Sequence, residues 1–193
     1  MTKMRCTFIF LLSVLSLTCA APPRSQKEIL SQFFRYAETI RGIHIHNMLG
    51  ALVNVLQQIV DSVPVEERGP GTSVQQSYIN RGRNLLQHGS TAEKYEHIYG
   101  QPGDDLNDSL SEFQKTEMSR IASKGYPSEV TKEYEKLHNK FTEGATQMKT
   151  KLTLATIAQE SEVFNAINKY ITSNDVQQHE TLIKEVLRFK NKY

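Results

Sequence analysis

The fold class is decided by residues 127–159, PSEVTKEYEKLHNKFTEGATQMKTKLTLATIAQ. Their apolar side chains recur every three or four residues, which is the spacing of one face of an α-helix. Pro127 and Ser128 are typical of a helix start, and Gly144 indicates a bend or a place of close packing. An unbroken helix over this segment would be about 48 Å long. The members of the apolar stripe are Val130, Tyr134, Leu137, Phe141, Ala145, Met148, Leu152 and Ala155.

The same helical period extends over most of the chain. Gly42 is expected to interrupt the first apolar stripe, Pro64 to end the second, and Ser90 with Glu93 to form a capping box. No segment alternates apolar and polar residues over the length of a strand, and no Asn-Gly or Asp-Gly dipeptide marks a hairpin. The sequence therefore predicts an all-α protein, a compact bundle of seven or eight amphipathic helices without disulfides. Besides 127–159, the expected helical segments are 26–40, 43–63, 74–88, 90–99, 106–124, 163–171 and 176–189.

Residues 1–20 have the pattern of a secretory signal peptide. Lys3 and Arg5 supply its positive start, Phe8–Leu17 its short apolar run, and Thr18–Ala20 a cleavage site of small residues. The apolar run is shorter than the ~20 residues that a membrane span needs, and no later segment is long and apolar enough. We expect a secreted, extracellular protein that does not span a membrane.

Removal of this peptide changes the composition. The chain has 23 basic and 21 acidic residues, and the loss of Lys3 and Arg5 leaves equal numbers of each. Both cysteines, Cys6 and Cys19, leave as well, so the mature chain has no disulfide, no cysteine ligand and no cysteine nucleophile. A balanced charge argues against a nucleic-acid partner, because such proteins usually carry a basic excess.

Proline and glycine mark two loops, because residues 64–73 hold two of each and residues 101–105 hold Pro102 and Gly103. We expect residues 21–193 to form a single helical domain, and a subdivision at one of these two loops is the alternative.

An oxygen-rich cluster begins at the second loop. Its carboxylates are of the kind that calcium and magnesium prefer. The cluster does not match an EF-hand, because Leu110 replaces the required glycine and Thr116 the bidentate glutamate. A weak, irregular calcium or magnesium site is the expectation, and a helix cap with a solvated acidic turn is the alternative. The candidate ligands are Asp104, Asp105, Asp108 and Glu112.

Two further motifs are short. Asn107 begins an Asn-Asp-Ser triplet, which is an acceptor pattern for N-glycosylation in a secreted chain. His44 and His46 are spaced so that two imidazoles could bind a metal, and surface histidines at a helix turn are the alternative.

Motifs of known enzyme classes are missing from the sequence. It has no Gly-x-Ser-x-Gly elbow, no phosphate-binding glycine loop and no His-Glu-x-x-His pair. We therefore expect no catalytic activity and no cofactor beyond the weak cation site.

Residues 48–63 are apolar over more than half of the circumference of their helix. Such a helix either lies centrally in a core or lines a cavity for an apolar ligand, such as a fatty acid or a sterol. The candidate wall of that cavity is Leu49, Leu52, Val53, Leu56, Ile59, Val60, Phe141 and Met148.

A series of short motifs lies in the second half of the chain: Glu135-Lys136-Leu137-His138, Lys140-Phe141-Thr142, Ala145, Lys151-Leu152-Thr153 and Ile157-Ala158. With these motifs, about residues 110–172 resemble the SXP/RAL family of nematode secreted antigens. The resemblance implies a secreted, all-helical, non-enzymatic protein that a host meets as an antigen, and a candidate binder of divalent cations.

Two functions follow as hypotheses. The first is a secreted, non-enzymatic helical protein that acts by binding an extracellular protein partner, as a parasite antigen or host-interaction protein would. The alternative is an extracellular carrier of a fatty acid or another small apolar ligand.

Overall fold

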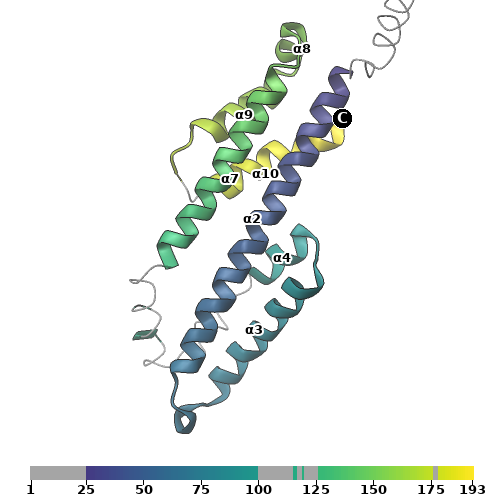
Figure 1. Cartoon of the computed structure of the whole chain (residues 1–193). Helices are drawn as coiled ribbons and strands as arrows, with labels where there is room; N and C mark the ends of the chain where they lie inside the picture. Colours follow the sequence, from purple (N-terminus) through teal and green to yellow (C-terminus); the bar gives the residue numbers. More distant parts are fainter. Residues whose placement is uncertain (1–24, 100–114, 117–118, 120–125, 176–177) are drawn as a thin grey trace, which may run out of the picture.

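The computed structural model describes residues 25–99, 115–116, 119, 126–175 and 178–193. All regular structure in these residues is helical and none of it is a strand, which confirms the all-α prediction (Figure 1). The elements are α2 (Gln26–Ser62), η1 (Val65–Glu67), α3 (Pro70–His88), α4 (Ala92–Tyr99), α7 (Tyr126–Lys149), α8 (Leu154–Gln159), α9 (Ser161–Thr172), α10 (His179–Leu187) and η3 (Arg188–Lys192).

Helix α2 runs for 37 residues along the length of the molecule (Figure 1). Ser25 caps it, because its side chain accepts a 3.1 Å hydrogen bond from the backbone of Glu28. The predicted break at Gly42 is wrong. A glycine inside a helix costs about 1 kcal/mol, whereas burying one large apolar side chain stabilises by about 1.5–3 kcal/mol. The apolar stripe continues on both sides of Gly42, with Ile40 and Ile45 buried, so the helix continues too.

The first half of α2 packs against α7, α9 and α10, and these form one hydrophobic core. Helix α7 lies beside α2 and runs in the opposite direction (Figure 1). Aromatic side chains fill the centre. The ring of Phe141 lies 5.4 Å from that of Phe33 and 4.3 Å from that of Tyr170, between centroids. We call this the α7–α9–α10 core.

The second half of α2 packs against α3 and α4, and forms a separate core with them. Tyr78 of α3 donates a 2.8 Å hydrogen bond to the carbonyl of Ile98 at the end of α4. Helix α3 lies so close to α2 that a Cβ atom on Gly82 would be 2.6 Å from Cγ2 of Val53. We call this the α3–α4 core.

The long helix predicted to reach Gln159 ends ten residues earlier, at Lys149. The hydrogen bonds of Thr153 stabilise the start of a new helix instead of the continuation of α7. Thr153 donates its backbone N–H to Gln26 of α2 over 2.7 Å, and its hydroxyl accepts from the backbone of Thr156 over 3.2 Å, which starts α8. The close packing predicted at Gly144 is confirmed, because a Cβ there would lie 2.4 Å from the ring of Tyr36.

Three helix starts also differ from the prediction. Helix α3 begins at Pro70, in the first-turn position that suits proline, so the loop before it is shorter than residues 64–73. At α4 the backbone N–H of Lys94 donates to the hydroxyl of Thr91, so Thr91 rather than Ser90 caps the helix. Helix α10 follows Gln178, and has no side-chain cap. The helix expected over 106–124 lies outside the described residues except at 115–116 and 119, which are helical.

Candidate functional site

The middle of α2, between the two cores, carries polar side chains on the buried face of the helix. Arg41 and His44 are only 6% and 5% exposed. Polar side chains from α4, α7 and α10 surround them. We call this group the polar junction, and its members are Arg41, His44, Glu96, Tyr134, His179, Glu180 and Lys184.

Two cations and two carboxylates form the ionic part of the polar junction. Arg41 donates from Nε to Oε1 of Glu180 over 2.9 Å, and from Nη2 to Oε2 of Glu96 over 2.6 Å. Lys184 donates to Oε1 of Glu96, and its Nζ lies 3.7 Å from Oε1 of Glu180. The four charges balance, and through them α2 holds α4 and α10 together.

Burial and ion pairing shift the pKa values of Arg41 and Glu96 in opposite directions. Burial alone would lower the pKa of Arg41, but the hydrogen bonds and charges of Glu180 and Glu96 raise it above the ordinary value. Burial would raise the pKa of Glu96, and the hydrogen bonds from Lys184 and Arg41 lower it below the ordinary value. Arg41 and Glu96 are therefore charged at neutral pH.

His44 is a neutral imidazole at the same pH. Burial lowers its pKa from 6.5 to about 4, although a hydrogen bond to the backbone of Glu133 opposes the shift. A neutral imidazole that donates one N–H to a carbonyl keeps its other nitrogen as an acceptor. The ring packs against Tyr134, with 4.6 Å between the centroids.

Several buried polar atoms of this region have no hydrogen-bond partner among the residues that the structure describes. They include Nδ1 of His44, Oε2 of Glu180, Nδ1 of His179 and the hydroxyl of Tyr170. About nine in ten buried polar groups in proteins have a partner, so a cluster of exceptions marks unused hydrogen-bonding capacity.

A cavity of about 170 Å³ lies at this point, and we call it the junction cavity. Two of the unpartnered atoms belong to residues of its wall, His44 and Glu180. The wall is built from all four surrounding helices. Its residues are His44, Ile45, Met48, Glu96, Tyr99, Tyr134 and Glu180.

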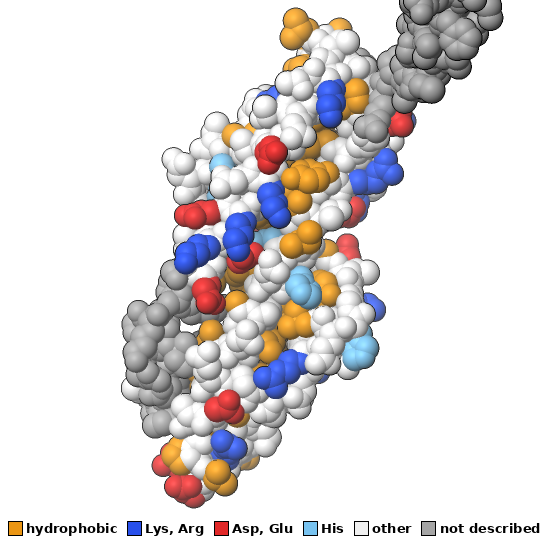
Figure 2. All heavy atoms as spheres, in the orientation of Figure 1, with side chains coloured by type: hydrophobic (Ala, Val, Ile, Leu, Met, Phe, Trp, Pro, Cys, Tyr) orange, Lys and Arg blue, Asp and Glu red, His pale blue; other side chains and the backbone are white. Residues whose placement is uncertain are grey.

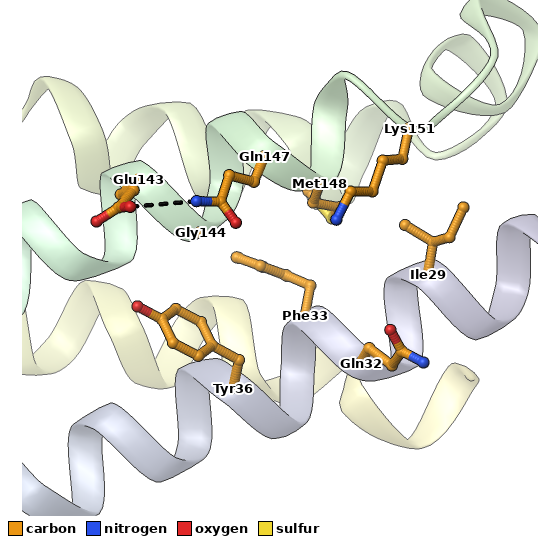
Figure 3. A pocket seen from close by; sticks show the side chains of 9 residues that line it. All are labelled: Ile29, Gln32, Phe33, Tyr36, Glu143, Gly144, Gln147, Met148 and Lys151. Atoms are coloured by element: carbon orange, nitrogen blue, oxygen red, sulfur yellow. Dashed lines mark hydrogen bonds between the residues drawn. The ribbon is translucent and has the colours of Figure 1, made fainter. Parts of the chain in front are cut away.

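A larger groove of about 420 Å³ lies on the surface between α2 and α7 (Figure 3). Three of its polar side chains, Tyr36, Glu143 and Gln147, are already paired. Gln147 donates to Glu143 over 3.1 Å, and the hydroxyl of Tyr36 donates to the carbonyl of Lys140 over 3.1 Å. Because none of its lining residues has a buried polar atom without a partner, this groove is a weaker candidate for a specific site than the junction cavity.

The structure does not bring the predicted apolar wall together. The six α2 residues of that wall, which run from Leu49 to Val60, pack in the α3–α4 core. Phe141 and Met148 belong to the α7–α9–α10 core. None of the eight residues lines the junction cavity.

The predicted metal ligands Asp104, Asp105, Asp108 and Glu112 and the glycosylation site Asn107 lie outside the described residues. The rings of His44 and His46 face different neighbours, since His46 packs against Tyr95 with 5.1 Å between centroids. In the described part of the chain no three His, Cys, Asp or Glu side chains are grouped to hold a metal ion.

Sequence reasoning missed the polar junction apart from His44. One signal was present. Arg41 and His44 lie in register with the apolar residues that flank them on α2, and a charged residue at such a position needs a buried partner. The partners Glu96 and Glu180 carry no comparable signal, because each is one of many acids on a helix surface.

Comparisons of this chain with protein-family models, with curated proteins and with solved structures found no match. Among the described helices, none has the length and apolar character needed to cross a membrane.

Proposed function

We propose that this protein is a secreted, non-enzymatic binding protein that holds a small molecule in the junction cavity. One observation carries the proposal. His44 and Glu180, which line a cavity among four helices, each carry a buried acceptor that has no partner in the described residues. A protein core without a ligand role normally fills such a place with apolar side chains or pairs its polar groups.

Secretion enters the proposal through residues 1–20, whose pattern is that of a signal peptide. The resemblance of about residues 110–172 to the SXP/RAL secreted antigens supports a non-enzymatic, extracellular role. Both supports are sequence patterns, and they are independent of the cavity.

A small ligand suits the cavity better than a fatty acid or a sterol. Pockets for drug-sized ligands usually measure about 300–1,000 Å³. The junction cavity measures about 170 Å³ and has charged as well as apolar walls. The apolar residues of α2 that suggested a lipid carrier are buried directly against α3 and α4.

A protein partner stays a prediction. On the face shown in Figure 2, basic and acidic side chains are interspersed and neither sign forms a continuous patch. Single apolar side chains on a surface are ordinary and do not define an interface. Those most exposed in the described residues are Tyr36, Ile43, Val65, Val74 and Leu154.

Thermal unfolding with a panel of small acids, alcohols, amines, sugars and fatty acids tests the proposal. A ligand present at 100 times its dissociation constant stabilises by roughly 2.7 kcal/mol, which raises Tm by roughly 5–10 °C in a domain of this size. The variant His44→Phe should lose that shift. His88→Phe, on the exposed surface of α3, should keep it.

Native mass spectrometry of the secreted protein is the second test. We expect an adduct of small mass that disappears on denaturation. A bare chain, together with no thermal shift from any member of the panel, would contradict the proposal.

A further inference from the structure

We propose that the junction cavity binds a small organic amine, in which a protonated amino group is carried on a compact apolar body. This inference rests on the proposed function and names the class of ligand. Two residues of the cavity wall each carry a buried atom without a partner among the described residues, Nδ1 of His44 and Oε2 of Glu180. Both are acceptors, because His44 is neutral and donates its other N–H to the backbone of Glu133.

Two acceptors require a ligand that donates. An ammonium group has three donors and no acceptor, so it can satisfy both atoms and leave no lone pair of its own unmet. Its hydrogen bond to a carboxylate is charge-assisted, and such bonds are shorter and stronger than neutral ones. A hydroxyl group has a single donor, and it meets only one of the two acceptors.

The charges around the cavity favour the same sign. Arg41 and Lys184 donate to Oε1 of Glu180 and to both oxygens of Glu96. Their charges are therefore already balanced, and Oε2 of Glu180 is the carboxylate oxygen left over. A cation that enters is attracted to the carboxylates of Glu96 and Glu180 on the wall, whereas an anion is repelled by both.

The remaining walls suit a compact apolar body. Met48 and Ile45 are buried, at 2% and 4% exposure, and the rings of Tyr99 and Tyr134 line the other sides. Aromatic faces also attract cations. A cavity of ~150 Å³ is known to hold benzene, so one of about 170 Å³ has room for a single ring.

The test compares three ligands of one shape on the full secreted chain at pH 7.4, by isothermal titration calorimetry. The amine is 2-phenylethylamine, which is protonated at this pH because such amines ionise near pKa ~10, as lysine does. The neutral match is 2-phenylethanol, and the anionic match is phenylacetate. We expect the amine to bind at least about tenfold more tightly than the alcohol, and phenylacetate not to bind.

Failure of this inference is distinguishable from failure of the proposed function. Equal binding of amine and alcohol, or tighter binding of phenylacetate, overturns the inference that the ligand is an amine but is compatible with a small-molecule site. If none of the three compounds binds, the inference of an amine ligand is overturned as well. If the wider ligand panel also gives no thermal shift, the proposed function falls with it, and the two acceptors are paired by water.

A pair of variants on one helix tests the role of the carboxylate. Glu180→Gln keeps the shape and one carbonyl oxygen but removes the charge, so we expect at least about tenfold weaker binding of 2-phenylethylamine. Glu185→Gln is the matched control, because Glu185 pairs with Lys169 on the far side of α10, over 3.1 Å, and should leave binding unchanged. Unchanged binding in Glu180→Gln overturns the assignment.

Folding of each variant is checked by circular dichroism. If Glu180→Gln does not fold, His44→Phe supplies the second test, since it removes the other acceptor and keeps the ring. Binding of 2-phenylethylamine by His44→Phe at wild-type strength also overturns the inference.

Discussion

His44 has charged or titratable neighbours on three helices. They are Arg41 on α2, Glu133 and Tyr134 on α7, and His179 on α10. Burial is the main cause of its lowered pKa, and the nearby charges of Arg41 and His179 lower it further. The backbone and the carboxylate of Glu133 act in the opposite direction. Its neighbour Tyr134 has a pKa raised chiefly by burial, so that ring stays neutral. Protonation of His44 therefore destabilises the folded protein relative to the unfolded chain.

This difference predicts a loss of stability in acid. The pKa of His44 is about 4 in the folded state and 6.5 when unperturbed, so its contribution is complete above pH 6.5 and is lost as the pH falls towards 4. We expect a loss of about 2–3 kcal/mol from this residue between pH 7 and pH 4.5. Urea unfolding at both pH values measures it.

The variant His44→Phe isolates the effect from the acidic side chains, which also lose stability in acid. Its unfolding free energy should fall less than that of the wild type over this range, and the exposed control His88→Phe should behave as the wild type does. Equal pH dependence in wild type and His44→Phe would show that His44 does not titrate with folding.

At the scale of elements, two helical glycines should respond in opposite ways to the same substitution. A Cβ on Gly82 would lie 2.6 Å from Val53, which is buried in the α3–α4 core and has no room to move. Overpacking of this kind costs about 1–3 kcal/mol, so Gly82→Ala should destabilise the protein despite its better helix propensity.

Gly50 on α2 is the matched control, because a Cβ there would meet nothing within 4 Å. Gly50→Ala should stabilise by about 0.5–1 kcal/mol through helix propensity alone. Chemical unfolding of both variants measures the change in unfolding free energy, which should be a loss for Gly82→Ala and a gain for Gly50→Ala. A stabilised Gly82→Ala would mean that α3 can move away from α2 without cost.

The helices were predictable where one apolar stripe decides them, as in α7, whose buried residues Leu137, Phe141 and Ala145 follow the expected period. Glycine was a poorer guide. Gly42 lies within α2, where burial on both sides outweighs its propensity, whereas the true end of α7 at Lys149 depends on a contact between Gln26 and Thr153. Helix boundaries set by contacts between distant elements are not readable from local sequence.

The candidate site could not be predicted from the sequence for a related reason. Arg41 meets Glu96 and Glu180, which are 55 and 139 residues away along the chain. Periodicity shows which face of α2 is buried, but it does not show which helix covers that face at a given turn. The apolar residues 48–63 were expected either in a core or on a cavity wall, and the structure buries them in the α3–α4 core, whereas the stripe before Gly42 lies in the α7–α9–α10 core.

At the scale of the whole molecule, α2 is the one described helix that contributes to both cores. Each core closes around its own half of the helix, and the polar junction lies between them. Ion pairs at a partly exposed junction contribute less than apolar burial does, so the two cores should differ in how readily they open.

Core variants and hydrogen exchange measured by mass spectrometry test this division. Ile79→Ala should cost about 2–5 kcal/mol and should speed amide exchange in α3 and α4 more than in α7 and α9. Phe141→Ala, of similar cost in the other core, should show the reverse pattern. Equal acceleration throughout the described helices in both variants would mean that the protein opens only as one unit.

The continuity of α2 also fixes the number of residues between the two cores. Ile40 belongs to one core and Ile45 to the other, and no loop between them could absorb a change in length. Insertion of a single residue there would turn everything beyond it by about 100° and shift it by about 1.5 Å. Insertion of seven residues would nearly restore the direction but move the cores about 10 Å apart, so Arg41 could no longer reach both Glu96 and Glu180. This stretch of helix therefore acts as a spacer of fixed length, which insertions and deletions in related chains should avoid.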